Sequence, residues 1–363
     1  MTFEMLVESA LSALPRRGDL AAVFLSENCK FPRYVIGRNE EAAAVLGRVS
    51  VDGVIDDYAN NLSHWCGVPV CSLKSVPATA IVVNCSTSIS PVAVIDNLNS
   101  AGLNNILNYS DLLKVKDGKF PLPWFVKQQR DDWQENHLRW KSLYERLEDE
   151  QSKRVLLDVC RYRLTADPEY MRGYAVRLKD QYFEDFMRYG QETFVDAGGF
   201  DGDTTETFCQ RYPDYASIFL FEPSSKNITA AKERLKHWGR INFLQLGLSD
   251  QVGTLSFNAD AGSASAVSSA GSEIIEVVTL DEAVHEPVSF IKMDLEGWEL
   301  KALSGSKGHI LRHKPKLAIS VYHGAADFHR IPEFIFSLNN QYRLYLRHYT
   351  QGWSETVMFF LPI

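Results

Sequence analysis

The first residues able to do chemistry in the second half of the chain surround a glycine-rich turn. Asp196 ends the apolar segment that starts at Thr193, and Gly198, Gly199 and Gly202 follow it. Glycines in a turn let the backbone come close to a ligand, and a helix that starts after the turn offers free N–H groups. The fixed negative charge of Asp196 would repel a pyrophosphate but attract an ammonium group. The turn therefore predicts a ligand with a cationic end.

A second carboxylate, that of Glu222, ends the next apolar segment. In open α/β sheets an acidic side chain at this position can bind the two hydroxyls of a ribose. The dinucleotide fingerprint Gly-x-Gly-x-x-Gly is incomplete because Ala197 occupies its first position. Asp196 and Glu222 together therefore predict a nucleoside ligand without a phosphate, namely S-adenosylmethionine. The alternative role of Glu222, capping the helix that follows, is equally open to Ser224 and Ser225.

Three further polar residues, Asp294, Glu296 and His323, follow apolar segments at 289–293 and 317–322. Methyl transfer from a sulfonium requires that the acceptor atom be aligned and that its proton be removed or shared. Because an imidazole suits proton removal near neutral pH, we expect His323 to take the proton and Asp294 to orient the acceptor, with Glu296 as a further candidate base. Two structural roles stay open: Glu296 as a carboxylate at a helix start, and His323 as a hydrogen-bonded residue at a strand end.

The same three residues, Asp294, Glu296 and His323, could instead hold a divalent metal ion. Two carboxylates and an imidazole are ligands that such ions accept. The spacing of these residues in the sequence does not decide between a metal site and proton transfer without a metal.

The elements that must position these residues alternate between strand and helix, as apolar segments and amphipathic or capped segments follow one another. This order predicts an α/β fold with a doubly wound sheet, an antiparallel edge hairpin and an added β-ribbon. The expected strands are 193–196, 218–222, 241–246, 289–294 and 317–322, with the hairpin at 342–348 and 356–361 and the ribbon at 253–257 and 274–279. The expected helices are 203–211, 224–237, one from about 298, and 331–338 opened by Pro332.

The chain before residue 191 divides into two parts. Alternating strand-like and helix-like segments predict a smaller Rossmann-like α/β domain over 1–120. Over 121–190 apolar residues recur at helical spacing, so we expect a helical connector in which Trp124, Trp133 and Trp140 pack on a core. The third domain then covers 191–363.

Several motifs, in this order along the chain, resemble those of the FkbM-type S-adenosylmethionine-dependent methyltransferases over about residues 193–361. The resemblance implies a class I fold with a seven-stranded sheet, S-adenosylmethionine as the methyl donor, and O-methylation of a hydroxyl on a sugar, glycan or natural product. The motifs are Asp196-x-Gly198-x-x-x-Gly202 after a strand, Phe221-Glu222-Pro223, Gly247-Leu-Ser-Asp250 with Gly253, Ile291-Lys-Met-Asp-Leu-Glu-Gly-Trp-Glu299, and the segment from Leu317 to His323.

The resemblance also assigns site residues according to the part of the cofactor that they would face. One departure is visible: Gly199-Phe200 stands where the family commonly has Ala-Asn, so the turn lacks a polar side chain. The residues implied are Asp196, Gly198 and Gly202 at the methionine end, Glu222 at the ribose, Ser249 and Asp250 near the adenine, and Asp294 and Glu296 at the transferred methyl group.

The first part of the chain, over about residues 21–112, resembles small nucleotide-sugar-binding α/β domains in the segments 34–37, 51–57 and 67–70 and in the strand around Val83. Such a domain could hold a substrate carrier or mediate contacts in a homodimer. Because only one glycine follows its first strand, a role in packing alone stays equally open. The formal net charge of −8 disfavours nucleic acid and anionic membranes as partners. We therefore expect a small-molecule or glycan acceptor, no nucleic-acid partner and no membrane insertion.

The six cysteines form no C-x-x-C pair and no apolar segment approaches the ~20 residues that span a bilayer, so we expect a cytoplasmic location.

Two other classes of function stay open at this point. A cofactor-binding scaffold without catalysis would keep the nucleoside site, and a nicotinamide-dependent oxidoreductase would use the same type of sheet. The incomplete dinucleotide fingerprint disfavours the oxidoreductase, and the residues Asp294 and His323 disfavour the scaffold.

Overall fold

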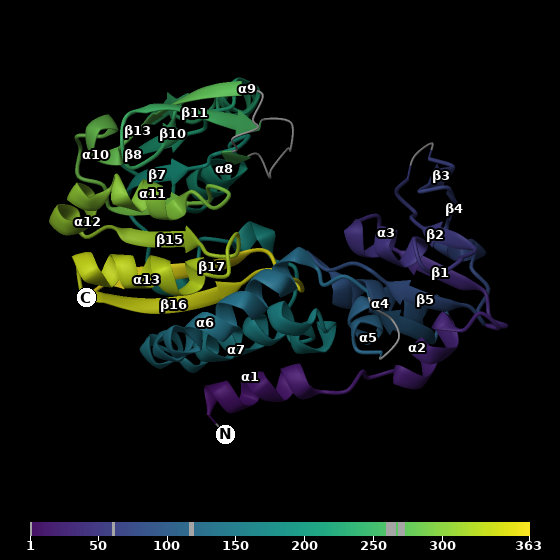
Figure 1. Ribbon diagram of the computed structural model, residues 1–363. Coiled ribbons are helices and arrows are strands. Elements are labelled where there is room, and N and C mark those ends of the chain that lie inside the picture. The colour runs from purple at the N-terminus through teal and green to yellow at the C-terminus, as the bar shows by residue number, and fades with distance from the viewer. Residues whose placement is uncertain (1, 60–61, 116–119, 259–265, 268–272) are drawn as a thin grey trace. The chain divides into compact units, whose positions relative to one another are not determined.

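The structure, a computed structural model (Figure 1), describes residues 2–59, 62–115, 120–258, 266–267 and 273–363. Contacts between Cα atoms divide the chain into two compact units. The first unit comprises Met1–His137, Arg154–Val176 and Tyr349–Ser354, and the second comprises Leu138–Lys153, Arg177–His348 and Glu355–Ile363. The division into three domains that we expect from the sequence stays a prediction.

The second unit is built on a seven-stranded sheet. Its strands are β7 (Thr193–Ala197), β8 (Ser217–Phe221), β9 (Ile241–Leu244), β14 (Phe290–Met293), β15 (Lys316–Ser320), β16 (Tyr342–His348) and β17 (Thr356–Pro362). Their order across the sheet is β16-β17-β15-β14-β7-β8-β9. The strands from β15 to β9 run parallel, whereas β17 pairs antiparallel with both β15 and β16. The doubly wound sheet with an antiparallel edge hairpin is thus confirmed.

Helices connect these strands in the alternation that the sequence predicts. The helices are α8 (Asp203–Arg211), α9 (Ser225–Arg234), α10 (Leu280–Ala283), α11 (Glu299–Ser304), α12 (Lys307–His313) and α13 (Asp327–Leu338), preceded by the 3₁₀ turns η3 (Leu178–Asp180) and η4 (Asp185–Met187). Helices α8 and α9 contact each other, and α13 contacts both α11 and α12.

The expectation that Pro332 opens the last helix is wrong. Helix α13 begins at Asp327, so Pro332 lies inside it. The helix starts earlier because its buried apolar face already includes Phe328, one turn before Pro332, and continues through Ile331 and Ile335.

A second, four-stranded sheet in this unit contains the expected ribbon. Its strands are β10 (Gly247–Leu248), β11 (Gly253–Asn258), β12 (Ala266–Val267) and β13 (Glu273–Val278), in the order β10-β13-β11-β12. Strands β11 and β13 pair antiparallel over residues 253–257 and 273–277, which confirms the ribbon. The ribbon forms a sheet of its own and is not part of the large sheet.

The first unit is a smaller α/β structure, as expected for the start of the chain. Its strands are β1 (Arg33–Ile36), β2 (Gly53–Ile55), β3 (His64–Trp65), β4 (Val68–Cys71), β5 (Ile81–Asn84) and β6 (Asn105–Asn108). They form one sheet in the order β3-β4-β2-β1-β5-β6, in which only the β3–β4 pair among the described strands is antiparallel. The helices are α1 (Phe3–Ser12), α2 (Gly18–Leu25), α3 (Glu40–Leu46), η1 (Leu73–Ser75), α4 (Pro91–Ser100) and α5 (Tyr109–Leu113).

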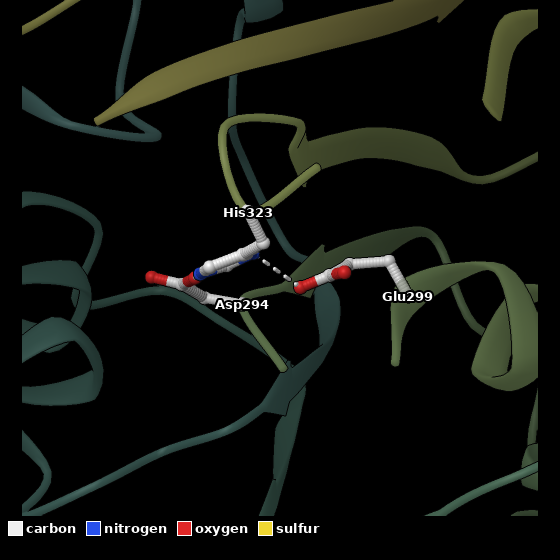
Figure 2. A group of neighbouring side chains, drawn as sticks. All are labelled: Asp294, Glu299 and His323. Carbon is white, nitrogen blue, oxygen red and sulfur yellow. Dashed lines mark ion pairs between the residues drawn. The ribbon is translucent and has the colours of Figure 1, made fainter. Parts of the chain in front are cut away.

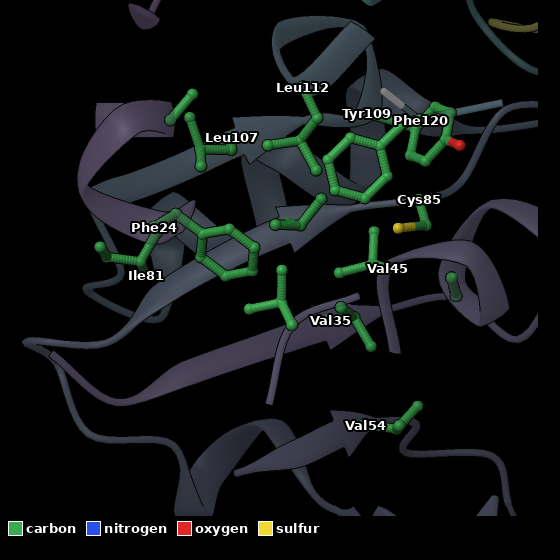
Figure 3. Packing of buried hydrophobic residues seen from close by; sticks show 14 residues of the cluster. Phe24, Val35, Val45, Val54, Ile81, Cys85, Leu107, Tyr109, Leu112 and Phe120 are labelled. Atoms are coloured by element: carbon green, nitrogen blue, oxygen red, sulfur yellow. The ribbon is translucent and has the colours of Figure 1, made fainter. Parts of the chain in front are cut away.

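The first unit has its own hydrophobic core (Figure 3). Phe24, Val35, Val45, Leu107 and Leu112 meet there, from both strands and helices. A unit with a core of this kind can hold its sheet without help from a ligand.

The expected helical connector consists of two long helices and a short turn, α6 (Trp124–Arg146), α7 (Glu150–Thr165) and η2 (Pro168–Met171). Asn136 interrupts α6 with non-helical backbone angles, next to the boundary between the two units. Trp133 and Trp140 are buried as expected, whereas Trp124 is 43% exposed and makes an edge contact with Trp353. None of the described helices is both long and apolar enough to cross a bilayer.

The packing of α6 in the second unit gives a first prediction. Trp140 is fully buried and stacks on Phe328 with 5.1 Å between ring centroids. Because truncation leaves a large cavity, Trp140→Ala should lower the free energy of unfolding by about 3–5 kcal/mol. The control Leu138→Ala, at a side chain that is 65% exposed, should change it by less than about 0.5 kcal/mol. Denaturant unfolding of the full chain measures the free energy of unfolding for both variants. An equal loss in the two variants would contradict the role of Trp140 in the core.

Candidate functional site

The candidate site lies at the carboxyl ends of β7 and β14, which are neighbours in the large sheet. The chain proceeds from β7 towards β8 on one side and from β14 towards β15 on the other. The strand order therefore reverses between β7 and β14, and open α/β sheets bind their ligands beside such a reversal. The glycine-rich turn follows β7 and Asp294 follows β14, so the sheet brings these two predicted groups to one place.

The turn after β7 is held tightly against both neighbouring strands. The amides of Gly198 and Gly199 both donate to the carbonyl of Phe221, at 3.0 Å each. Gly198 has a φ of +76°, and a Cβ there would lie 2.0 Å from the backbone oxygen of Asp294. A Cβ on Gly199 would lie 2.5 Å from Leu220. These glycines are therefore required by the packing of the turn, whatever ligand approaches it.

Asp196 does not present a free charge to a ligand. Its side chain is completely buried, lies 3.0 Å from the Nζ of Lys292, and accepts a hydrogen bond from Thr205 at 2.7 Å. The ammonium group that the structure places beside Asp196 is that of Lys292, and the expected contact of Asp196 with a ligand stays a prediction. Lys292 also donates to the carbonyl of Gly198 at 2.7 Å, so the ion pair fixes the turn.

Hydrogen bonds to the carboxylate of Glu222 hold the other end of the turn. Its carboxylate accepts hydrogen bonds from the amide of Phe200 at 3.0 Å and from the amide of Ser224 at 2.9 Å. Burial raises the pKa of Glu222, although these hydrogen bonds oppose the change. Oε1 also accepts a hydrogen bond from Asn227 at 3.4 Å, so Oε2 is the oxygen with room for a further hydrogen bond, such as one from a ribose hydroxyl.

Ser249 and Asp250, assigned to the adenine by resemblance, interact with the start of α11. The indole of Trp298 donates to the hydroxyl of Ser249 at 3.3 Å. The Nζ of Lys301 lies 2.8 Å from Asp250, and this hydrogen bond lowers the pKa of the carboxyl group. Trp298 thus supplies a flat apolar surface beside Ser249, which is suited to a purine ring.

The structure brings Asp294, Glu296 and His323 together, as the sequence predicts. The Nε2 atom of His323 lies 3.4 Å from Asp294 Oδ1 and 3.4 Å from Glu296 Oε2. A third carboxylate, that of Glu299, lies 3.0 Å from the opposite ring nitrogen, Nδ1 (Figure 2). We call Asp294, Glu296, Glu299 and His323 the carboxylate–histidine cluster.

The charges in this cluster set the protonation of its members. Burial disfavours a charged ring on His323, but Glu299, Glu296 and Asp294 outweigh it and raise the pKa well above the usual value. Burial likewise disfavours a charged Asp294, yet His323, Lys292 and a hydrogen bond from Tyr182 lower its pKa. A cation is therefore favoured at His323, between carboxylates.

Sequence reasoning missed Glu299, Tyr182 and Glu355. Tyr182 donates to Asp294 Oδ2 at 2.7 Å, and Gln181 donates to Glu355 at 2.8 Å. Burial, with the charge of Asp294, raises the pKa of Glu355 to about 7. Glu299 was visible in the motif that ends with it, but neither Tyr182 nor Glu355 carries a local sequence signal.

The buried ion pair gives a second prediction. Lys292→Met should destabilise the chain by about 3–5 kcal/mol, because it leaves Asp196 charged and uncompensated in the interior. The double variant Asp196→Asn/Lys292→Met should be less destabilised than Lys292→Met alone, since no buried charge remains. As a control, Lys301→Met removes the partly exposed pair with Asp250 and should cost less than about 1 kcal/mol. Thermal and denaturant unfolding compare the three, and a double variant worse than the single one would refute the assignment.

Comparisons with known proteins find similarity to one family model and to several solved methyltransferase structures. Residues 196–344 match the family model described as the methyltransferase FkbM domain. The fold resembles the crystal structure of methyltransferase FkbM from Methylobacillus flagellatus, with a TM-score of 0.75 and 22% identity over 99% of this chain and 98% of that one. An rRNA methylase from Streptococcus thermophilus overlaps less, with a TM-score of 0.35 and 15% identity over 49% of this chain and 93% of that one. No match is found among curated protein sequences. The similarity to the methyltransferase FkbM domain therefore covers residues 196–344 of the chain, which contain the glycine turn and the carboxylate–histidine cluster.

Proposed function

We propose that this protein transfers a methyl group from S-adenosylmethionine to a hydroxyl of a small-molecule or glycan acceptor, such as a sugar or natural product. The observation that carries the proposal is the carboxylate–histidine cluster beside the glycine turn, within the residues that match the methyltransferase FkbM domain. The turn provides a place for the donor, and the cluster provides groups that can orient a hydroxyl and receive its proton.

The residues around the turn fit a nucleoside donor. Oε2 of Glu222 has room to accept one hydrogen bond from a ribose hydroxyl, and Trp298 with Ser249 offers a surface for the base. Asp196 supports the turn through its ion pair with Lys292, and its place at the methionine end of the donor stays a prediction. In this arrangement Gly198 and Gly202 position the backbone, and Asp250 anchors α11 through Lys301.

When bound, S-adenosylmethionine supplies a methyl group on a sulfonium that is already a good leaving group. The protein's own task is therefore to align the acceptor oxygen, exclude water and remove a proton. Asp294 suits alignment, because Tyr182 fixes one of its oxygens at 2.7 Å. Proton removal by His323 alone would need a neutral ring, whereas the surrounding carboxylates favour a charged one. We therefore assign this step to the cluster as a whole, including Glu296.

The third prediction concerns the donor. The full chain should bind S-adenosylhomocysteine at one site and should not bind NAD, which separates a methyltransferase from an oxidoreductase. Glu222→Gln should weaken this binding by roughly 1–3 kcal/mol, the range for hydrogen bonds to a charged group. The control Glu233→Gln changes a carboxylate on the exposed side of α9 and should leave affinity unchanged. Calorimetry tests this, and tight NAD binding with no response to S-adenosylhomocysteine would refute the proposal.

The fourth prediction separates catalysis from a scaffold role. Asp294→Asn and His323→Asn should leave affinity for S-adenosylhomocysteine nearly unchanged but slow turnover by ~10²–10⁴-fold, the range for a positioned acid or base. Methylated products are found by mass spectrometry after incubation of the protein with methyl-labelled donor and a metabolite extract. Full turnover in the double variant would move catalysis elsewhere, and no product with any acceptor would favour a scaffold.

A further inference from the structure

We propose that Asp294, Glu296 and His323 bind one divalent transition-metal ion, and that Glu299 holds the histidine ring in the orientation that binding requires. The existence of this site follows from the arrangement of the side chains, whereas its role in methyl transfer rests on the proposed function. The ion would lie at the end of β14, between the Nε2 atom of His323 and the two carboxylates.

The spacing of the donor atoms suits a shared ion. Nε2 lies 3.4 Å from an oxygen of Asp294 and 3.4 Å from an oxygen of Glu296. Two ligand atoms bound at ~2.0–2.1 Å in tetrahedral geometry are separated by about 3.3 Å. A direct hydrogen bond between a ring nitrogen and a carboxylate is shorter, usually about 2.7–2.9 Å. The observed spacing is therefore closer to that of neighbouring ligands than to that of hydrogen-bonded partners.

His323 needs a partner for Nε2. The side chain is only 8% exposed, and neither ring nitrogen makes a hydrogen bond of acceptable geometry with any described residue. Nδ1 is 3.0 Å from Oε1 of Glu299, an ion-pair distance, so Nε2 is the ring nitrogen that lies near both Asp294 and Glu296. A lone pair on Nε2 would face two negatively charged groups, which is unfavourable unless a cation lies between them.

Glu299 occupies the position of the outer carboxylate in a carboxylate–histidine–metal arrangement. Ligand histidines commonly donate their other ring N–H to such a group, which fixes the tautomer and the ring. Glu299 is itself held, because it accepts the amide of Leu295 at 2.7 Å and is 1% exposed. One donor atom from each of Asp294, Glu299 and His323 lies within 4.8 Å of the other two. Because Oε1 of Glu299 already accepts the amides of Leu295 and Gly297, we assign Glu299 to holding the ring.

The backbone after β14 turns Glu296 towards the ring. Glu296 has a φ of +52°, an unfavourable region for a residue with a side chain, and Gly297 follows with a φ of +93°. Such strain persists where the surrounding structure or a function requires it. Glu296 and Asp294 remain 24% and 21% exposed, so an ion and an acceptor hydroxyl can both reach them.

The donor set also indicates the class of ion. One imidazole with two carboxylates suits first-row divalent ions such as Mn²⁺, Fe²⁺ or Zn²⁺ better than Ca²⁺ or Mg²⁺, which prefer oxygen ligands alone. Lys292 does not fill this role, since it is paired with Asp196. An ion with an open coordination position would bind the acceptor hydroxyl, hold it in place and lower its pKa.

The test uses the full chain after treatment with a chelator and dialysis, with Mn²⁺ alone as the probe. Electron paramagnetic resonance of free Mn²⁺ gives the bound fraction directly, without any need for an acceptor. We expect one ion per chain in the wild type. Glu296→Gln, at a partly exposed side chain, should reduce the affinity by at least ~10-fold, and Glu299→Gln should reduce it by ~10–100-fold, as for other outer partners of ligand histidines.

The matched control is Glu233→Gln, which changes an exposed carboxylate in the same unit and should bind Mn²⁺ like the wild type. Thermal unfolding of each variant shows whether it is folded, and Glu296→Gln keeps the test decisive if a change at His323 prevents folding. No uptake by the wild type at millimolar Mn²⁺, or equal uptake by all variants, would overturn the proposal, and a proton would then be the cation on Nε2.

Calorimetry with S-adenosylhomocysteine on the same metal-depleted chain keeps this proposal distinct from the proposed function. A chain that binds S-adenosylhomocysteine and makes methylated product, but takes up no Mn²⁺, would overturn the metal site alone. A chain that takes up Mn²⁺ through Glu296 but does not bind S-adenosylhomocysteine would overturn the methyltransferase proposal and leave the metal site standing.

Discussion

The arrangement of the candidate site depends on one buried ion pair, between Lys292 on β14 and Asp196 on β7. These residues are paired in register on neighbouring parallel strands, and their charged atoms lie 3.0 Å apart. Lys292 also binds the carbonyl of Gly198, so the same ammonium group attaches the turn to the strand that leads to Asp294. Burying two charges is costly unless each is well paired, which makes this connection sensitive to the loss of either partner.

Much of the fold could be predicted from local pattern. The strands around Val195, Leu220 and Ile291 are largely apolar, apart from the paired Asp196 and Lys292, because both faces of the central sheet are covered. The start of α13 at Asp327 could not be found in this way, because Pro332 suggested a later start while the buried stripe from Phe328 decides the helix. Tertiary burial outweighs a local signal at that point.

The site could be predicted only in part, for a physical reason. Asp294 and His323 follow neighbouring parallel strands, so the sheet itself brings them together and their positions in the sequence suffice. Tyr182 reaches the same place from a segment rich in 3₁₀ turns, and Glu355 from the residue before β17, and no periodicity marks either. The pairing of Asp196 with Lys292 was equally hidden, because the sequence shows a carboxylate but not which cation will neutralise it.

The two ends of the site therefore differ in net charge. Around the turn, Asp196 and Lys292 cancel each other and leave a rigid, nearly neutral backbone surface, which suits a donor that brings its own positive charge. Around His323, three carboxylates surround one imidazole, so negative charge is in excess. A hydroxyl becomes a better nucleophile as its proton is drawn away. The excess charge favours a cation beside His323, whether a proton or a metal ion, near the end of β14, the strand next to the one that carries the turn.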